Sequence, residues 1–323
     1  MMLCKYDVLC IGSATVDSFL NVETSFAKIK LGDKIIVSSI EKHSGGGATN
    51  SAVALAKFGL KVKVLTKLGN DHDGEFIAQE LKSHKIDNTC QHHSNKHTDT
   101  AVILDYIKEK DRVIYVHKGA SEDLTGHDLK LSQLNTTWIY LATLMKTSFK
   151  TGEIISKYAS KHKIPLLFNP SLYLAQKGKA ELKPILSATK VLVLNLEEAQ
   201  ALLKDKNSSV EKLLQELHAL GPETVVITNG PKKLYTYHKN YIYSLLTPKV
   251  KVVHTAGAGD AFTAALLGAM IKKYSFEESL RIGQANASSV IQAVGVKHKL
   301  LSEKEALKMA EKHRLKVEKY GLS

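Results

Sequence analysis

The amino-acid sequence predicts an α/β fold in which helices flank a mostly parallel sheet that carries a small β lid. Helical and β-rich segments alternate regularly from residue 150 onward, and such alternation is typical of βα units. Two pairs of β-rich segments, within about 18–44 and 98–118, do not alternate with helices, so we assign them to the lid. The 323 residues are ample for a substantial core, and we expect one α/β domain over residues 1–323.

The composition is ordinary for a globular protein, with 44% hydrophobic and 24% charged residues. The 45 basic residues exceed the 32 acidic ones, which gives a net charge of +13, but no basic block is interleaved with aromatic residues. We therefore expect attraction for phosphorylated ligands and no nucleic-acid partner. The chain has no run of about 18 apolar residues, and its start carries charges in place of the apolar core of a signal peptide. These features predict no membrane association and a cytoplasmic location.

The first predicted strand covers residues 6–11 and ends at Gly12. Residues 13–17 then form a loop at the carboxyl end of that strand, which is where ligands bind in open α/β sheets. Asp17 is therefore a candidate for binding a hydroxyl-bearing substrate. An ordinary turn aspartate is the alternative explanation.

The lid is expected to consist of four β-rich segments without a helical period. The second pair reads as a hairpin with a charged connection at 108–111. Exposed lid strands could pair two subunits edge to edge, so a homodimer through the lid is a further hypothesis. The four segments are residues 19–22, 34–40, 101–107 and 112–116.

A glycine-rich stretch at residues 45–47 opens the first predicted helix, 51–58. Glycines at Gly46 and Gly47 permit close approach of a ligand to the backbone, and the amide of Asn50 could bind a substrate hydroxyl. A glycine-rich helix start without a ligand is equally compatible with this pattern.

Polar residues follow the strands of the regular βα part, and these tips are expected to meet at the carboxyl edge of the sheet. Asn195 and Glu198 follow one strand, and Thr228, Asn229 and Gly230 end the next. The acidic residues near 198 could equally be charges that stabilise a helix start. The further predicted strands are 62–65, 138–141, 165–168, 191–194 and 224–228, and the helices are 71–82, 151–162, 180–186, 210–220, 276–290 and 302 to about 320.

A β-branched run at 250–253, a glycine turn and a long apolar segment to residue 271 predict strand, turn and helix. Gly257, Ala258 and Gly259 form the turn, and free N–H groups at the start of the helix make an anion site. Asp260 places a carboxylate where a phosphate would bind. Repulsion makes that a poor choice for simple phosphate binding, but it suits a base that takes a proton from an attacking hydroxyl. The alternative explanation is an ordinary glycine turn that is capped by an aspartate and has no catalytic role.

Three motifs in order, the glycine-rich helix start near 45, N-x-x-E at 195–198 and T-A-G-A-G-D-A-F at 255–262, resemble the ribokinase-like carbohydrate kinases, also called the phosphofructokinase B family. The order of features matches from about residue 6 to residue 295. The resemblance implies a doubly wound α/β fold with a small β lid over the sugar. It also implies transfer of the γ-phosphoryl group of ATP to a hydroxyl of a small sugar or nucleoside, with Mg²⁺.

The resemblance assigns roles to the candidate residues. It implies that Asp260 is the general base and that the backbone at Gly257, Ala258 and Gly259 forms an anion hole. It implies that Asn195 and Glu198 organise the Mg²⁺-bound phosphates, with Glu198 acting on the metal through water. The remaining implied contacts are Thr228, Asn229, Gly230 and Gln284 for the nucleotide, and Asp17, Gly46, Gly47 and Asn50 for the substrate hydroxyls.

The chain departs from the family pattern at three positions. His254 stands where ribokinase-like enzymes carry an aspartate that helps to hold a monovalent cation, so we expect weak or absent potassium activation. Gly47 replaces a lysine of ribokinases proper, and Leu144 stands near the place of a sugar-binding glutamate. These differences leave a nucleoside or another sugar open as the substrate.

Three other classes of protein agree less well with these features than a kinase does. A catalytically retired nucleotide or sugar sensor is conceivable because of His254, although the intact Asp260 argues against it. A Rossmann oxidoreductase is disfavoured because no G-x-G-x-x-G follows the first strand, and a P-loop enzyme because no G-x-x-x-x-G-K-[ST] occurs.

Overall fold

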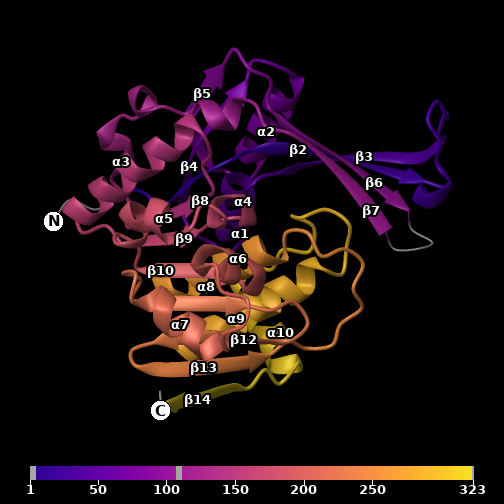
Figure 1. Cartoon of the computed structure of the whole chain (residues 1–323). Coiled ribbons are helices and arrows are strands. Elements are labelled where there is room, and N and C mark those ends of the chain that lie inside the picture. The colour runs from indigo at the N-terminus through magenta and orange to yellow at the C-terminus, as the bar shows by residue number, and fades with distance from the viewer. Residues whose placement is uncertain (1–4, 107–110, 322–323) are drawn as a thin grey trace.

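The computed structural model describes residues 5–106 and 111–321 and contains two sheets (Figure 1). The larger sheet has the strand order β14-β13-β12-β11-β10-β9-β8-β1-β4-β5, and the smaller has the order β3-β2-β6-β7. The strands of the larger sheet are β1 (Val8–Ile11), β4 (Val62–Gly69), β5 (Asp87–Ser94), β8 (Trp138–Ala142), β9 (Leu166–Asn169), β10 (Val191–Asn195), β11 (Thr224–Thr228), β12 (Lys233–His238), β13 (Tyr241–Leu246) and β14 (Val317–Gly321).

The larger sheet is parallel from β5 to β11, and the last three strands join it antiparallel. Parallel strands connected by helices bring their carboxyl ends to one edge. The predicted α/β fold with a mostly parallel sheet is therefore confirmed.

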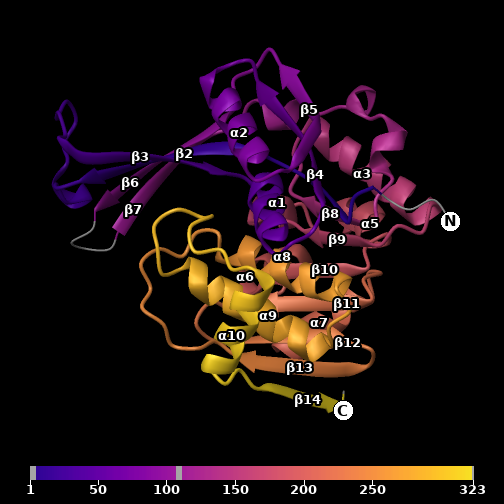
Figure 2. The same ribbon diagram turned by 180° about the vertical axis from the view of Figure 1, so that it is seen from behind.

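Helices cover both faces of the larger sheet, as the two opposite views show (Figures 1 and 2). Along β1, Val8 and Cys10 pack into one buried cluster, while Leu9 and Ile11 pack into another. This alternation explains why the strand reads as continuously apolar. The first face carries α1 (Gly47–Lys57), α2 (His72–Ser83), α8 (Ala258–Ile271), α9 (Phe276–Val290) and α10 (Glu303–Lys312); the second carries α3 (Thr147–Lys161), α4 (Leu172–Ala175), α5 (Lys179–Leu186), α6 (Leu196–Leu203) and α7 (Val210–His218).

Helix α8 lies deep in the protein, because all its residues from 261 to 269 are buried. It packs against α1 and α9. Among the described helices, none is long and apolar enough to cross a membrane.

The small sheet consists of β2 (Thr15–Val22), β3 (Val37–Gly45), β6 (Asp99–Tyr106) and β7 (Asp111–His117), and it projects sideways from the larger sheet (Figure 1). β2 pairs parallel with β6 and antiparallel with β3. Asp17 lies opposite His43 on one side and Ala101 on the other. The predicted segments at 19–22, 34–40, 101–107 and 112–116 fall in or beside these strands, although residue 107 and the connection to residue 110 lie outside the described residues.

Three predictions of local structure are wrong. Asp17 lies within β2 and not in a loop, because the chain enters the small sheet as early as Thr15. Residues 250–253 form no strand: Val252 and Val253 are 55% and 49% exposed, and the Val253 N–H bonds to Ile291 O at 2.8 Å. The β-branched pattern predicted a strand here, but these valines have no cross-strand partners.

The predicted final helix also ends early, at Lys312, and the chain continues as the edge strand β14. Ser244 and Lys233 both donate to Glu318, and the Lys319 ammonium lies 4.1 Å from the ring centroid of Tyr241. These contacts come from β12 and β13, a pair of strands that the sequence reasoning did not identify. Local helix propensity therefore could not predict the end of the helix.

Candidate active site

The amino end of α8 forms the centre of the site. Gly257 caps the helix with φ +78°, and a Cβ there would lie 2.6 Å from Cβ of Val296. Both facts require glycine at this position. Ala258, Gly259 and Asp260 form the first turn, and a Cβ at Gly259 would meet open space. The first-turn N–H groups and the helix dipole therefore leave room for an anion beside Gly259.

Asp260 is partly buried and bonds to a residue 210 positions away in the chain. The amide of Asn50 on α1 donates to Asp260 Oδ2 at 2.8 Å. Burial raises the pKa of Asp260, while the Asn50 bond and the positive charge of Lys297 act in the opposite direction. Asn50 Oδ1 is buried and has no hydrogen-bond partner among the described residues, and Asn50 is not part of the cavity lining described below. The two predicted site residues are thus brought together.

A cavity of about 440 Å³ lies over the carboxyl edge of the parallel strands and reaches Asp260. Strand tips from β1, β8, β9, β10 and β11 contribute to its walls, as expected for an α/β sheet. Its lining includes Ser13, Asp17, Gly46, Gly47, Lys118, Glu122, Thr143, Met145, Asn169, Tyr173, Asn195, Glu198, Thr228, Gly257, Gly259 and Asp260.

One half of the cavity lies under the small sheet and contains Asp17. Burial raises the pKa of Asp17 to about 6; the positive charges of Lys297, Lys118 and His43 oppose this effect, and the negative charge of Asp260 adds to it. Gly46 beside it has φ +97°, and a Cβ there would lie 2.5 Å from Ser13 O. The glycine stretch therefore lets the backbone run close to Asp17 and to the cavity.

The other half of the cavity contains Asn195 and Glu198 at the start of α6. Asn195 Oδ1 accepts the Glu198 N–H and Glu198 Oε2 accepts the Asn195 N–H, both at 2.8 Å, which is a capping box. Burial raises the pKa of Glu198 to about 7, with a further contribution from the charge of Asp260. The pair therefore stabilises the helix start and also presents a carboxylate to the cavity.

The carboxylate at this end of the cavity suits a cation that is also bound by the oxygens of a phosphorylated ligand. No group of three or more His, Cys, Asp or Glu side chains in the described ranges could hold a metal by itself. Mg²⁺ in nucleotide sites usually binds one or two carboxylates together with phosphate oxygens and water. Glu198 supplies one such carboxylate next to the anion site of α8.

The remaining predicted nucleotide contacts are placed less uniformly. Thr228 lines the cavity, and its hydroxyl donates to Leu194 O. Asn229 and Gly230 follow directly, at the end of β11, but are not part of the lining. Gln284 is buried inside α9, where its amide donates to Ser288 Oγ at 3.1 Å. The structure does not bring Gln284 to the cavity.

His254 lies at the start of the turn that leads to α8. Its ring contacts Phe19 of β2 edge to face, with 5.3 Å between centroids, and its Nδ1 accepts the N–H of Ala256. The imidazole therefore packs against the small sheet. No carboxylate stands at this position of the turn, which is the basis of the expectation about potassium.

The sequence reasoning missed four residues of the site. Lys118 and Glu122 line the cavity from the end of the small sheet and from the short helix η2 (Ala120–Asp123). Tyr140 is fully buried, its hydroxyl donates to Asn169 Oδ1, and burial together with the charge of Asp260 raises its pKa. Lys297 lies in the segment after α9. None of the four carries a local motif, so only the three-dimensional structure identifies them.

The fold is α/β, and the cavity at one edge of its sheet brings together the start of α8, Asp260 and Glu198. The pfkB family carbohydrate kinase model matches residues 5–303, and the chain belongs to this family.

The chain is similar along its length to curated kinases of the same size. It is 27% identical to the nucleoside kinase of Methanocaldococcus jannaschii, over 95% of this chain and 98% of that protein. It is 30% identical to the ribokinase of Bacillus subtilis, over 90% of this chain and 94% of that protein. Such relatives are phosphotransferases acting on hydroxyl groups, and this chain is an enzyme of that kind.

Solved structures show the same fold. The crystal structure of the Methanocaldococcus jannaschii nucleoside kinase has a TM-score of 0.77 at 26% identity and covers 95% of this chain and 99% of its own. Ribokinase from Thermotoga maritima has a TM-score of 0.83 at 24% identity, with coverages of 95% and 99%. The ribokinase-like doubly wound fold is therefore established.

Proposed function

We propose that this kinase transfers the γ-phosphoryl group of ATP to a hydroxyl of a small sugar or nucleoside, with Asp260 as the general base. The observation that carries the proposal is the position of Asp260. It lies between the half of the cavity that contains Asp17 and the half that contains Glu198, on the first turn of α8. A base at this point can reach an acceptor hydroxyl while the helix start faces the transferred group.

The proposed reaction needs one proton transfer and much charge stabilisation. The acceptor oxygen attacks the γ-phosphorus, ADP leaves, and the proton of the acceptor hydroxyl passes to Asp260. Burial favours this role because it raises the pKa of Asp260, which makes the carboxylate a stronger base. Asn50 holds the carboxylate in position by its bond to Oδ2.

The first turn of α8 would stabilise the charge that develops on the transferred group. The N–H groups at Gly257, Ala258 and Gly259 and the helix dipole act there without reorganisation. A Mg²⁺ ion beside Glu198 would neutralise phosphate charge and orient the donor. Asn195, Thr228, Asn229 and Gly230 would border the nucleotide. A solved ribokinase II from E. coli in complex with ATP and Mg²⁺ has the same fold, with a TM-score of 0.82.

The acceptor would bind under the small sheet. Asp17 and the backbone at Gly46 and Gly47 line this half of the cavity and offer hydrogen-bond acceptors and donors of the kind that vicinal hydroxyls need, and we propose that Asn50, which holds Asp260, joins them when the acceptor binds. Met145 and Tyr173 also line the cavity and could lie against a nucleobase. This apolar surface, together with the nucleoside kinase relative, keeps a nucleoside acceptor as the second candidate.

A screen of acceptors tests the proposed reaction. ADP release from Mg-ATP would be measured with a panel of pentoses, hexoses, sugar phosphates and nucleosides. We expect saturable turnover with a sugar or a nucleoside. Absence of turnover with every member of the panel would contradict the proposal and favour a sensor.

The small sheet is also our proposed contact for a homodimer. On the face opposite to Asp17, the register places Ile40, Leu20, Leu104 and Val113 side by side across all four strands. Ile40 is 65% exposed and Tyr115 on the same face is 62% exposed. A row of exposed apolar side chains across a sheet is a typical surface for pairing with a second copy.

A further inference from the structure

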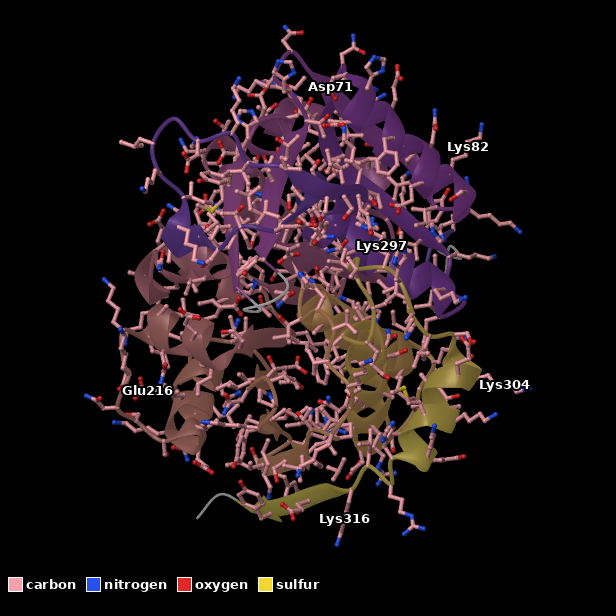
Figure 3. The ribbon with its side chains drawn as sticks, turned by 90° about the vertical axis from the view of Figure 1, so that its right-hand side faces the viewer. Asp71, Lys82, Glu216, Lys297, Lys304 and Lys316 are labelled. Carbon is pink, nitrogen blue, oxygen red and sulfur yellow. The ribbon has the colours of Figure 1, made fainter. Side chains whose placement is uncertain are left out.

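Lys297 is a buried lysine in the segment that follows α9. Its side chain is 8% exposed, and its Nζ lies 2.6 Å from Glu80 Oε2 of α2 and 2.6 Å from Ser44 Oγ of β3. In Figure 3, Lys297 lies at the junction between the amino-terminal part and the carboxyl-terminal loop, whereas Lys82 and Lys304 lie at the periphery. Burying an ammonium group is costly unless it is paired, so this lysine has a defined place in the fold.

The bond to Ser44 connects Lys297 with the acceptor half of the cavity. Ser44 precedes Gly45, and Gly45 pairs with Thr15 next to Asp17. A Cβ at Gly45 would collide with Asp17 Oδ2, so the backbone of residue 45 lies directly against that carboxylate. The same stretch continues into Gly46 and Gly47 of the cavity wall. Lys297 thus holds the backbone that supports Asp17.

The charge of Lys297 acts on the same carboxylate. It lowers the pKa of Asp17, against the larger effect of burial, and it also lowers the pKa of Asp260. Lys118 and His43 are the other cationic groups near Asp17, and Asp260 is the nearby anionic one. Burial lowers the pKa of Lys297 itself, while the charges of Glu80, Asp17 and Asp260 raise it.

We propose that Lys297 is a positioning residue of the acceptor site, which holds residues 44–47 against Asp17 and places a buried positive charge near that carboxylate. The inference rests on the proposed function, because an ionised Asp17 matters when it accepts hydrogen bonds from acceptor hydroxyls. Lys297 does not contact the acceptor. It acts through Ser44, the glycine stretch and the field at Asp17.

The test uses variants that separate the charge from the packing. Lys297→Met removes the charge but leaves Glu80 unpaired, whereas Glu80→Gln/Lys297→Met removes both charges and is the variant expected to fold better. Lys297→Arg keeps a permanent positive charge. Lys299→Met is the matched control, because Lys299 is exposed in the same segment and bonds to Gln292 O.

The readouts are kcat and KM for the acceptor and the pH profile of kcat/KM. In both methionine variants we expect the midpoint of the acidic limb of the kcat/KM profile to move to higher pH by roughly half to one unit. We also expect the acceptor KM to rise about tenfold, with a smaller change in kcat. The arginine variant and the Lys299 control should show an acidic limb with the same midpoint as the wild type. An unmoved limb in the neutral double variant would overturn the proposal, since a merely structural role lowers activity equally at all pH values.

A second measurement does not depend on turnover. Carbon NMR follows the carboxyl group of Asp17 through a pH titration of the free protein, in the wild type and in the double variant. The titration midpoint should rise in the variant, and equal midpoints would contradict the role of Lys297. If the wild type phosphorylates no acceptor while this midpoint shifts, then the proposed function has failed and the electrostatic role of Lys297 stands.

Discussion

Asp17 should cost the protein stability at neutral pH, because its pKa is raised from 3.8 to about 6, mainly by burial. The folded state then holds the proton of Asp17 more tightly than the unfolded chain does. Its contribution to the free energy of unfolding is present below about pH 4 and is lost as the pH rises through 6. A shift of about two pKa units corresponds to at most about 3 kcal/mol. Asp17→Asn removes this cost.

Urea unfolding of the wild type and of Asp17→Asn at about pH 4.5 and about pH 8 measures the effect, because these two conditions bracket the shifted pKa of Asp17. The stability of the variant relative to the wild type should rise by about 1–3 kcal/mol between these conditions. Asp33→Asn, which replaces an exposed carboxylate, is the control and should show no such rise. An Asp17 variant that is no more stable than the wild type at the higher pH would refute the burial argument. The same variant should lose binding of the acceptor, because it lacks the ionised carboxylate that we propose accepts hydrogen bonds from the acceptor hydroxyls. A buried carboxylate that is kept for function in this way often reduces stability.

Four further predictions concern other parts of the site and the small sheet. Gly257→Ala should lower the free energy of unfolding by about 1–3 kcal/mol, because of its positive φ and the contact with Val296. Gly259→Ala should keep the stability but lose turnover, because its Cβ would occupy the anion site. Potassium should change kcat by less than about twofold, because His254 replaces a carboxylate. Ile40→Lys/Tyr115→Lys should convert a dimer into a monomer with turnover per chain retained, because two charges interrupt the apolar face.

Each of these outcomes has a direct check. Denaturant unfolding and ADP release distinguish the two glycine variants, and equal stability losses in both would contradict the geometry of the turn. A titration of KCl against NaCl at constant ionic strength measures the potassium effect, and a large activation by potassium would contradict the expectation. Light scattering after gel filtration gives the mass, and an unchanged dimer in the double lysine variant would exclude this face as the contact.

The features of the site that the sequence could predict are those whose chemistry lies within a few neighbouring residues. The turn before Asp260 combines a glycine with positive φ, a helix start and a carboxylate in four consecutive positions, so the proposed anion site follows from local geometry. Asn195 and Glu198 are similarly local, since the capping box joins residues three apart.

The features that could not be predicted depend on partners far away in the chain. Lys297 is one of many lysines in the sequence, and only the fold brings it to Glu80 and Ser44. The strand at the end of the chain also depends on distant residues, because β14 forms by pairing with β13. The run at 250–253 shows the converse, since its β-branched residues find no strand to pair with. In these segments, contacts with distant parts of the chain override the local secondary-structure propensity.

The most direct test of the account is the turnover of Asp260→Asn with Mg-ATP and the preferred acceptor. The substitution keeps the size of the side chain and a hydrogen bond to Asn50, so folding and nucleotide binding should be retained. Without the base, we predict that kcat falls by about 10²–10⁴-fold. Calorimetric binding of the nucleotide to the variant serves as the control. A kcat within a few fold of the wild type would contradict the assignment of Asp260 as the base.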